Sequence, residues 1–179
     1  MKTKKCRSIF TLDHYNSNEG MLTSVWGPSM WHTLHIISFN YPVNPTKEDK
    51  NNYKKFILGL KDILPCKYCR DNLKENFTKL PLTSKVMKNR ENFSLYIYNL
   101  HEKINDLLGK ESGLSYDDVR DRYEHFRANC KKKRKTIKKT HKGCLKPLHK
   151  FKSKGVIRIV PDDTVCESIQ IDKKCNIIQ

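Results

Sequence analysis

The spacing of apolar residues along the chain predicts a protein built of helices. In residues 46–64, apolar side chains recur every three or four positions, as expected for one face of a helix. Similar patterns recur along the chain, and the five stretches that we expect to be helical are residues 27–40, 46–64, 66–79, 90–108 and 115–126. No segment between residues 24 and 130 alternates with period two, so we expect a compact all-α bundle with short connections.

Turn and capping residues separate these stretches. Pro28 is typical of a first helical turn, and Thr46 is a good N-cap. Pro65 ends the second helix, because a residue before proline is pushed away from helical geometry. Gly109 is typical of a C-terminal cap, and Ser115 with Asp118 resembles a capping box.

The chain divides into four parts by composition. Residues 1–23 are predicted to be a flexible basic leader and residues 24–130 the helical domain. Residues 131–152 are a basic linker, and residues 153–179 form an extension whose short β-branched runs could make a small β-hairpin.

The net charge of +17 is concentrated at one end of the chain, because residues 131–179 carry 15 basic and 4 acidic side chains. Contact with acidic partners or nucleic acid would therefore rest on this tail, and any nucleic-acid binding would be non-specific. No apolar run approaches the ~20 residues of a membrane span, and no apolar signal region follows the basic N-terminus. We expect an intracellular protein without a secretory signal or a membrane span.

Among seven cysteines, only Cys66 and Cys69 stand close enough to form a motif. A zinc site would need two more ligands, which His141, Cys144 or His149 could supply, but they lie in no compact knuckle. A purely structural disulfide is disfavoured, because so short a loop removes little unfolded-state entropy. A cysteine pair whose disulfide is made and broken during a reaction fits the sequence context better than either of these.

The position of the pair at the start of a helix supports redox chemistry. The helix dipole and unpaired backbone N–H groups there stabilise a thiolate, and Lys67 and Arg70 add positive charge. The βαβ pattern of thioredoxin-like proteins is absent around the pair. A dithiol on a helical bundle needs another electron acceptor.

Three blocks in register carry a resemblance to a known family. They are WGPSMWHTLHIISFNYPVNPT at residues 26–46, the cysteine pair after a helix and a proline, and ENFSLYIYNLHEKINDLLGK at residues 91–110. Together they resemble the small FAD-linked sulfhydryl oxidases of the Erv/ALR type, in particular those of large DNA viruses.

The resemblance implies a four-helix bundle with a short fifth helix, FAD at one end, and a homodimer. It implies oxidation of dithiol protein substrates, with electrons passing from Cys66 and Cys69 through FAD to oxygen and releasing hydrogen peroxide. Cys69 would lie nearer the flavin, and Cys66 would exchange with substrate. The expected cofactor-binding residues are Trp31, His35, Tyr41, His101, Asn105, Lys110 and Tyr123. A viral member would work in host cytoplasm or virion.

The chain departs from the family pattern at two positions. Glu102 stands where the family often has asparagine, and Ser115 stands where the family has the usual disulfide partner of Cys130. Cys130 is then free or pairs with Cys144. Cys166 and Cys175 form a shuttle pair, a local staple or free thiols. The alternative functions are a basic zinc- and nucleic-acid-binding module and an inactive FAD-binding scaffold.

Overall fold

The computed structural model describes residues 10–129, 147–148, 153–167, 169–172 and 175. Their α-helices are α1 (Leu12–Asn16), α2 (Thr23–Phe39), α3 (Lys47–Ile63), α4 (Lys67–Lys79), α5 (Arg90–Leu107) and α6 (Tyr116–Glu124), and a 3-10 turn, η1, spans Val86–Lys88. These described residues contain no β-strand, so the helical fold is confirmed.

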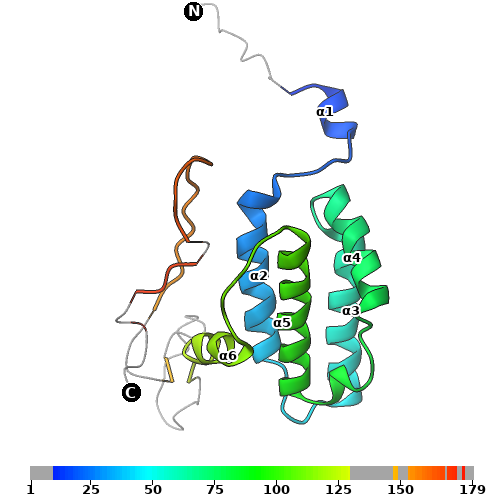
Figure 1. Ribbon diagram of the computed structural model, residues 1–179. Helices are drawn as coiled ribbons and strands as arrows, with labels where there is room; N and C mark the ends of the chain where they lie inside the picture. Colours follow the sequence, from blue (N-terminus) through cyan, green and yellow to red (C-terminus); the bar gives the residue numbers. More distant parts are fainter. Residues whose placement is uncertain (1–9, 130–146, 149–152, 168, 173–174, 176–179) are drawn as a thin grey trace, which may run out of the picture.

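Four long helices form the bundle, and α6 lies across one end of it (Figure 1). Helix α2 packs on α5 and α3 packs on α4, while α6 contacts both α2 and α5. Helix α1 stands at the opposite end, beyond the start of α2 (Figure 1). The arrangement is the predicted four-helix bundle with a short additional helix.

Each long helix contributes buried side chains to one core, which explains the spacing found in the sequence. Leu34, Ile57, Leu73 and Ile97 come from α2, α3, α4 and α5 in turn, and all are buried. A second, smaller cluster of Phe39, Val119 and Tyr123 holds α6 against α2. Burial of these apolar surfaces is the main force that assembles the bundle.

The predicted helix ends are close to the observed ones, with one clear difference. Thr46 and Ser115 both cap their helices through capping boxes, and Gly109 has a φ of +64°. Helix α2, however, begins at Thr23 rather than near Pro28, which lies inside it. The missing N–H of Pro28 removes one helical hydrogen bond, yet the first turn is retained because it has contacts described below.

Of the segment expected to be a flexible leader, residues 1–9 lie outside the described residues, and residues 10–22 contain a short helix and contacts to the bundle. Thr11 and His14 form a capping box that starts α1, and residues 18–22 are docked on the bundle. The reason is tertiary contact, which a composition rich in polar residues does not reveal.

The β-hairpin expected in residues 153–179 is not formed in the described part of that extension. A turn is present, in which Thr164 N–H donates to the Pro161 carbonyl (3.0 Å). Ile157, Ile159 and Val165 on either side are all exposed, so no apolar face is buried to stabilise strand pairing.

Candidate redox site

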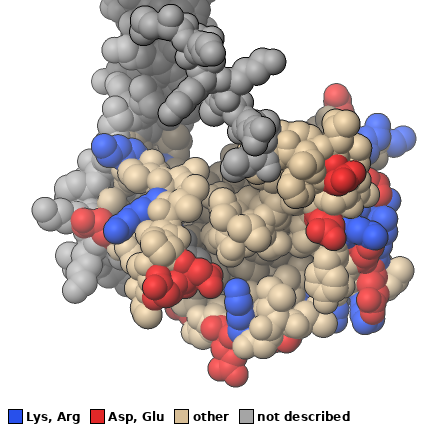
Figure 2. Space-filling view, turned by 90° about the horizontal axis from the view of Figure 1, so that it is seen from above, with Lys and Arg blue, Asp and Glu red and all other residues tan. Residues whose placement is uncertain are grey.

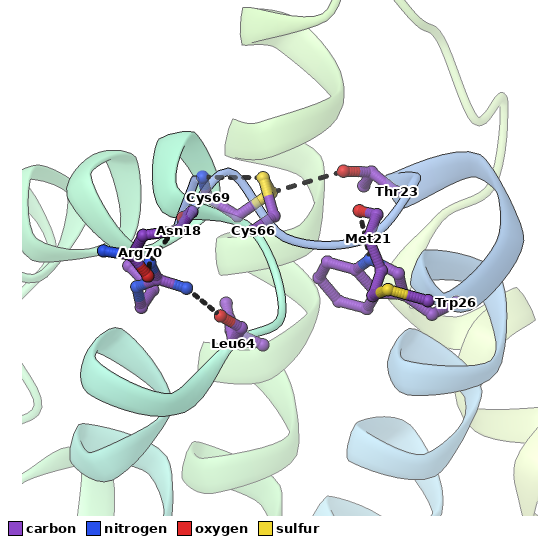
Figure 3. Close-up of a disulfide and its surroundings, with 8 residues drawn as sticks. All are labelled: Asn18, Met21, Thr23, Trp26, Leu64, Cys66, Cys69 and Arg70. Atoms are coloured by element: carbon purple, nitrogen blue, oxygen red, sulfur yellow. Dashed lines mark hydrogen bonds between the residues drawn. A yellow bond between two sulfur atoms is a disulfide. The ribbon is translucent and has the colours of Figure 1, made fainter. Parts of the chain in front are cut away.

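Cys66 and Cys69 form a disulfide at the N-terminus of α4, with Cα atoms 5.2 Å apart (Figure 3). Pro65 separates α3 from this turn, and Cys66 is the N-cap of α4. The Cys69 backbone N–H donates to Cys66 Sγ (3.1 Å). When the pair is reduced, this N–H and the helix dipole favour a thiolate on Cys66, as the sequence predicted.

Thr23 contacts the other sulfur from the first turn of α2. Its hydroxyl lies 3.4 Å from Cys69 Sγ (Figure 3). No sequence pattern points to this residue, because it is 46 positions from Cys69. Thr23 can donate a hydrogen bond to a thiolate on Cys69.

A segment before α2 is bonded to the cysteine turn, and we call residues 18–22 the clasp. Met21 N–H donates to the Pro65 carbonyl (2.6 Å), and Lys67 N–H donates to the Glu19 carbonyl (3.1 Å). At Gly20, with φ +95°, an added Cβ would lie 2.4 Å from the Pro65 oxygen. Only glycine fits so close to the turn.

The Arg70 side chain joins the clasp to the turn as well (Figure 3). Its guanidinium donates to the Leu64 carbonyl (2.6 Å) and to both oxygens of Asn18 (3.0 and 3.3 Å). This basic residue therefore organises the backbone around the disulfide, in addition to adding the charge that the sequence indicated.

Four of the predicted cofactor residues form what we call the ring cluster: Trp31, His35, His101 and Tyr123, from α2, α5 and α6. Trp31 stacks on His101 with ring centres 4.0 Å apart, and His35 stacks on Tyr123 at 5.1 Å. His35 Nε2 and His101 Nδ1 are hydrogen-bonded at 3.0 Å. Helices distant in sequence thus bring together residues that the resemblance implied.

The ring cluster is uncharged at neutral pH. Burial lowers the pKa of His35 to about 3, with help from the nearby His101 and His32, and lowers the pKa of His101 to about 4. Burial raises the pKa of Tyr123 to about 12. The buried Nδ1 of His35 has no hydrogen-bond partner, so one nitrogen of the cluster can bond a ligand atom.

His32 belongs beside the ring cluster and was missed by sequence reasoning. Its Nδ1 lies 3.2 Å from the Tyr123 hydroxyl, and burial lowers its pKa. Because it directly follows Trp31, it points to a different side of the ideal helix, and no spacing rule selects it.

The disulfide and the ring cluster are connected along one row of α2. Thr23, Gly27, Trp31 and His35 recur every fourth residue and therefore lie on one side of the helix. With a rise of about 1.5 Å per residue, Thr23 and Trp31 are about 12 Å apart along the axis. The buried Gly27 between them has no side chain, and a Cβ added there would lie 3.3 Å from the methyl group of Thr23.

The remaining predicted cofactor residues lie apart from the rings. Tyr41 is fully buried in the core, and its hydroxyl donates to the Met87 carbonyl (3.0 Å), so its contacts are structural. Asn105 is half-buried on α5 and donates to Glu102 (3.0 Å), the residue that departs from the family pattern. Lys110 is exposed just after α5.

The structure gives partial information on the other cysteines. Cys166 is exposed and Cys175 is half-buried, and both are free thiols, so no staple joins them. Cys130 and the candidate zinc ligands His141, Cys144 and His149 fall outside the described residues. Within the described ranges, no three metal-ligating side chains gather, and no helix has the length and apolar character to cross a membrane.

A helical bundle with a disulfide at a helix start and an adjoining row of aromatic rings defines an all-α thiol–disulfide oxidoreductase. The chain belongs to the Erv1/Alr family, whose family model matches residues 28–127. The match falls within residues 24–130, which the sequence assigned to the helical domain.

Viral proteins are among its relatives. The chain is 36% identical over 94 residues to a probable FAD-linked sulfhydryl oxidase of Acanthamoeba polyphaga mimivirus, covering 52% of this chain and 65% of that protein. It is 31% identical over 99 residues to a FAD-linked sulfhydryl oxidase of African swine fever virus, covering 55% and 80% of the two chains.

Solved structures share the fold. The FAD binding domain of Erv1 from Saccharomyces cerevisiae matches with a TM-score of 0.52 and 24% identity, covering 57% of this chain and 94% of that one. A mutant of the same yeast protein matches with a TM-score of 0.53 and 20% identity, covering 69% and 96%. At these sequence identities, the structural similarity shows a shared fold and nothing more specific.

Proposed function

We propose that this chain is a FAD-dependent thiol oxidase that makes disulfide bonds in protein substrates. The observation that carries the proposal is the Cys66–Cys69 disulfide, held at the start of α4 and in contact with the helix that bears Trp31 and His35. Family membership and the names of the relatives support the same activity.

The residues present suit FAD. A flavin and an adenine need flat aromatic neighbours, and a pyrophosphate needs cationic or amide donors. Trp31, His101 and Tyr123 supply the faces, the unpaired Nδ1 of His35 supplies a polar atom, and Asn105 and Lys110 lie at the end of the same helix α5 or just after it. When bound, FAD accepts two electrons from a reduced dithiol and delivers them to oxygen, which leaves as hydrogen peroxide.

The chain's own residues account for the thiol exchange. A substrate thiolate attacks Cys66 Sγ, a substrate–Cys66 disulfide forms, and the Cys66–Cys69 bond breaks. Cys69 leaves as a thiolate, which the Thr23 hydroxyl stabilises by donating a hydrogen bond. The second substrate thiolate then attacks the substrate sulfur of the mixed disulfide. Substrate gains its disulfide, and Cys66 leaves as a thiolate that the Cys69 N–H stabilises.

The contacts of the two cysteines support their separate roles. Cys69 faces Thr23 on α2, the helix that carries the ring cluster, so it is the sulfur that would pass electrons to the cofactor. The turn at Cys66 is bonded to the clasp, and among the described residues the Cys66 sulfur has no hydrogen bond to α2. Following the family resemblance, we assign the exchange with substrate to Cys66.

We extend the proposal to oxygen as the terminal acceptor, to a homodimer, and to a location in host cytoplasm or virion, following the family resemblance and the viral relatives. The exposed apolar side chains of Ile36 on α2 and Phe56 on α3 offer surface for dimer contact. The basic tail, residues 131–179, would bind acidic partners or nucleic acid without sequence specificity. Cys166 and Cys175 remain candidates for an electron shuttle.

An absorption spectrum tests the proposal directly. The full chain should purify with a flavin spectrum that bleaches when dithiothreitol is added without oxygen, and it should consume oxygen in air. Cys69→Ser should abolish oxygen consumption and retain the flavin, whereas Cys166→Ser, at an exposed free thiol, should retain dithiothreitol oxidation. A colourless protein with bound zinc would favour the zinc-binding alternative, and a yellow protein inert toward dithiols would favour the scaffold.

A further inference from the structure

Five large apolar side chains in the segments that meet at the cysteine turn are exposed to solvent, and we call them the apolar rim. Their exposed fractions are 74% for Leu22, 71% for Ile63, 70% for Tyr68, 69% for Met21 and 45% for Val25. Each lies within two residues of a group that contacts the cysteine turn or its sulfurs. Gathered apolar exposure of this kind usually marks an interaction site.

The rim comes from two distant segments that only the fold joins. Met21, Leu22 and Val25 belong to the clasp and the start of α2, while Ile63 ends α3 and Tyr68 stands between the two cysteines. The hydrogen bond from Met21 N–H to the Pro65 carbonyl (2.6 Å) joins the two segments. The rim therefore draws side chains from both segments that meet at the cysteine turn.

The backbone of the cysteine turn is already saturated with hydrogen bonds. The Leu64 carbonyl accepts hydrogen bonds from the Arg70 guanidinium and from Cys66 N–H. The Pro65 carbonyl accepts one from the clasp, and Lys67 N–H donates one to the clasp. A partner cannot pair with this turn by adding a strand, because the clasp takes that position. Recognition must come from side chains.

Figure 2 shows this end of the molecule from above, with uncharged residues over much of the middle of the face and charged residues of both signs beside them. The exposed Glu19, Asp62 and Lys67 lie within two residues of rim residues in the sequence. Apolar side chains of a partner would therefore bind on uncharged surface that is bordered by charge.

We propose that the apolar rim is the docking surface for substrate polypeptide in extended form, with apolar residues flanking its cysteines. Such sequences are exposed in unfolded or newly made proteins and become buried after folding. The inference rests on the proposed function, because thiol exchange requires substrate sulfur to bond Cys66 and so brings the adjoining substrate residues onto Met21, Leu22 and Tyr68. The rim selects substrates by their neighbours, while the disulfide performs the exchange.

The test compares two synthetic reduced peptides with the same cysteine pair, one flanked by leucine and phenylalanine and one flanked by serine. With the FAD-loaded full chain, the KM for the apolar peptide should be about tenfold lower than for the polar one, as expected when two large side chains are partly buried. The double variant Leu22→Ser, Tyr68→Ser should bring the two KM values together. Val43→Ser, at an exposed apolar residue in the loop after α2, is the matched control and should keep the preference.

A second measurement separates this inference from the proposed oxidase activity. Fluorescent copies of the apolar and the polar peptide, each with serine for cysteine, are titrated into the full chain and followed by anisotropy. If dithiothreitol is not oxidised but the apolar peptide binds and the double variant loses this binding, the oxidase proposal fails and the docking surface stands. If dithiothreitol is oxidised but both peptides bind alike, the docking surface is refuted alone.

Two further outcomes would also overturn the inference. One is a double variant that keeps the full apolar preference. The other is a double variant that changes from dimer to monomer in sedimentation, which would assign the rim to a second copy of this chain.

Discussion

The contact between Thr23 and Cys69 offers the sharpest prediction on the chemistry. Thr23→Val keeps the shape of the side chain and removes the hydroxyl that lies 3.4 Å from Cys69 Sγ. A hydrogen bond to a charged group contributes roughly 1.5–3 kcal/mol, and the exposure of Thr23 lowers this to about 1 kcal/mol because water competes for the thiolate. At that value the thiolate fraction of Cys69 should fall about fivefold.

Alkylation measures this change at a single cysteine. The full chain is reduced and treated with iodoacetamide at a pH where most of Cys69 is still protonated, and peptide mass spectrometry gives the rate at that residue. Thr23→Val should slow the reaction about fivefold, and Thr23→Ser should restore it.

A matched control lies on the same helix. The Thr33 hydroxyl donates to the Ser29 carbonyl (2.8 Å), so Thr33→Val changes helix propensity in the same way but touches no sulfur. The reasoning is refuted if Thr23→Val leaves the rate at Cys69 unchanged, or if Thr33→Val slows it equally.

Three other predictions concern the clasp, the core and the ring cluster. Gly20→Ala, whose Cβ would meet the Pro65 oxygen at 2.4 Å, should detach the clasp, seen as faster hydrogen exchange of its amides; unchanged exchange would contradict the steric argument. Tyr41→Phe removes a buried hydrogen bond, so the free energy of unfolding measured in urea should fall by about 1 kcal/mol. FAD affinity should be unchanged, and weaker FAD binding would show that Tyr41 contacts the cofactor. His35 and His101, with pKa values of about 3 and about 4 in the folded protein against 6.5 unfolded, take up protons on unfolding below pH 6.5. Stability of the FAD-free protein should therefore be complete above pH 6.5 and fall toward pH 4, by up to about 1.4 kcal/mol per pH unit for each histidine, and a flat urea-denaturation profile in that window would refute burial of the neutral rings.

Helix positions were largely predictable because their signals are local. Thr46 and Ser115 cap the helices that they were expected to cap, and Pro65 stands between α3 and the cysteine turn. A capping box or a proline acts within a few residues, so sequence spacing alone reveals it. The start of α2 was misplaced, since Pro28 resembled a helix start and the contact that retains the earlier turn comes from Cys69.

The candidate site was predictable in part. Trp31, His35, His101 and Tyr123, which the resemblance implied, lie near one another in the structure, and the cysteine pair was recognised from its own spacing. The role of these four residues in cofactor binding stays a prediction. Tyr41 shared the same sequence block, but its ring points into the core. A block of sequence aligns residues along the chain and does not say which face of the helix or loop each one occupies.

The sequence by itself determined the helices, their caps, the excess charge of the tail and the redox pair at a helix start, since each of these depends on neighbours a few residues away. Tertiary structure alone decided that Thr23 meets Cys69, that residues 18–22 are bonded to the cysteine turn, and that the two segments carrying the exposed apolar side chains meet there. Those contacts join segments tens of residues apart, and they arise from the packing of whole helices, which local patterns do not encode.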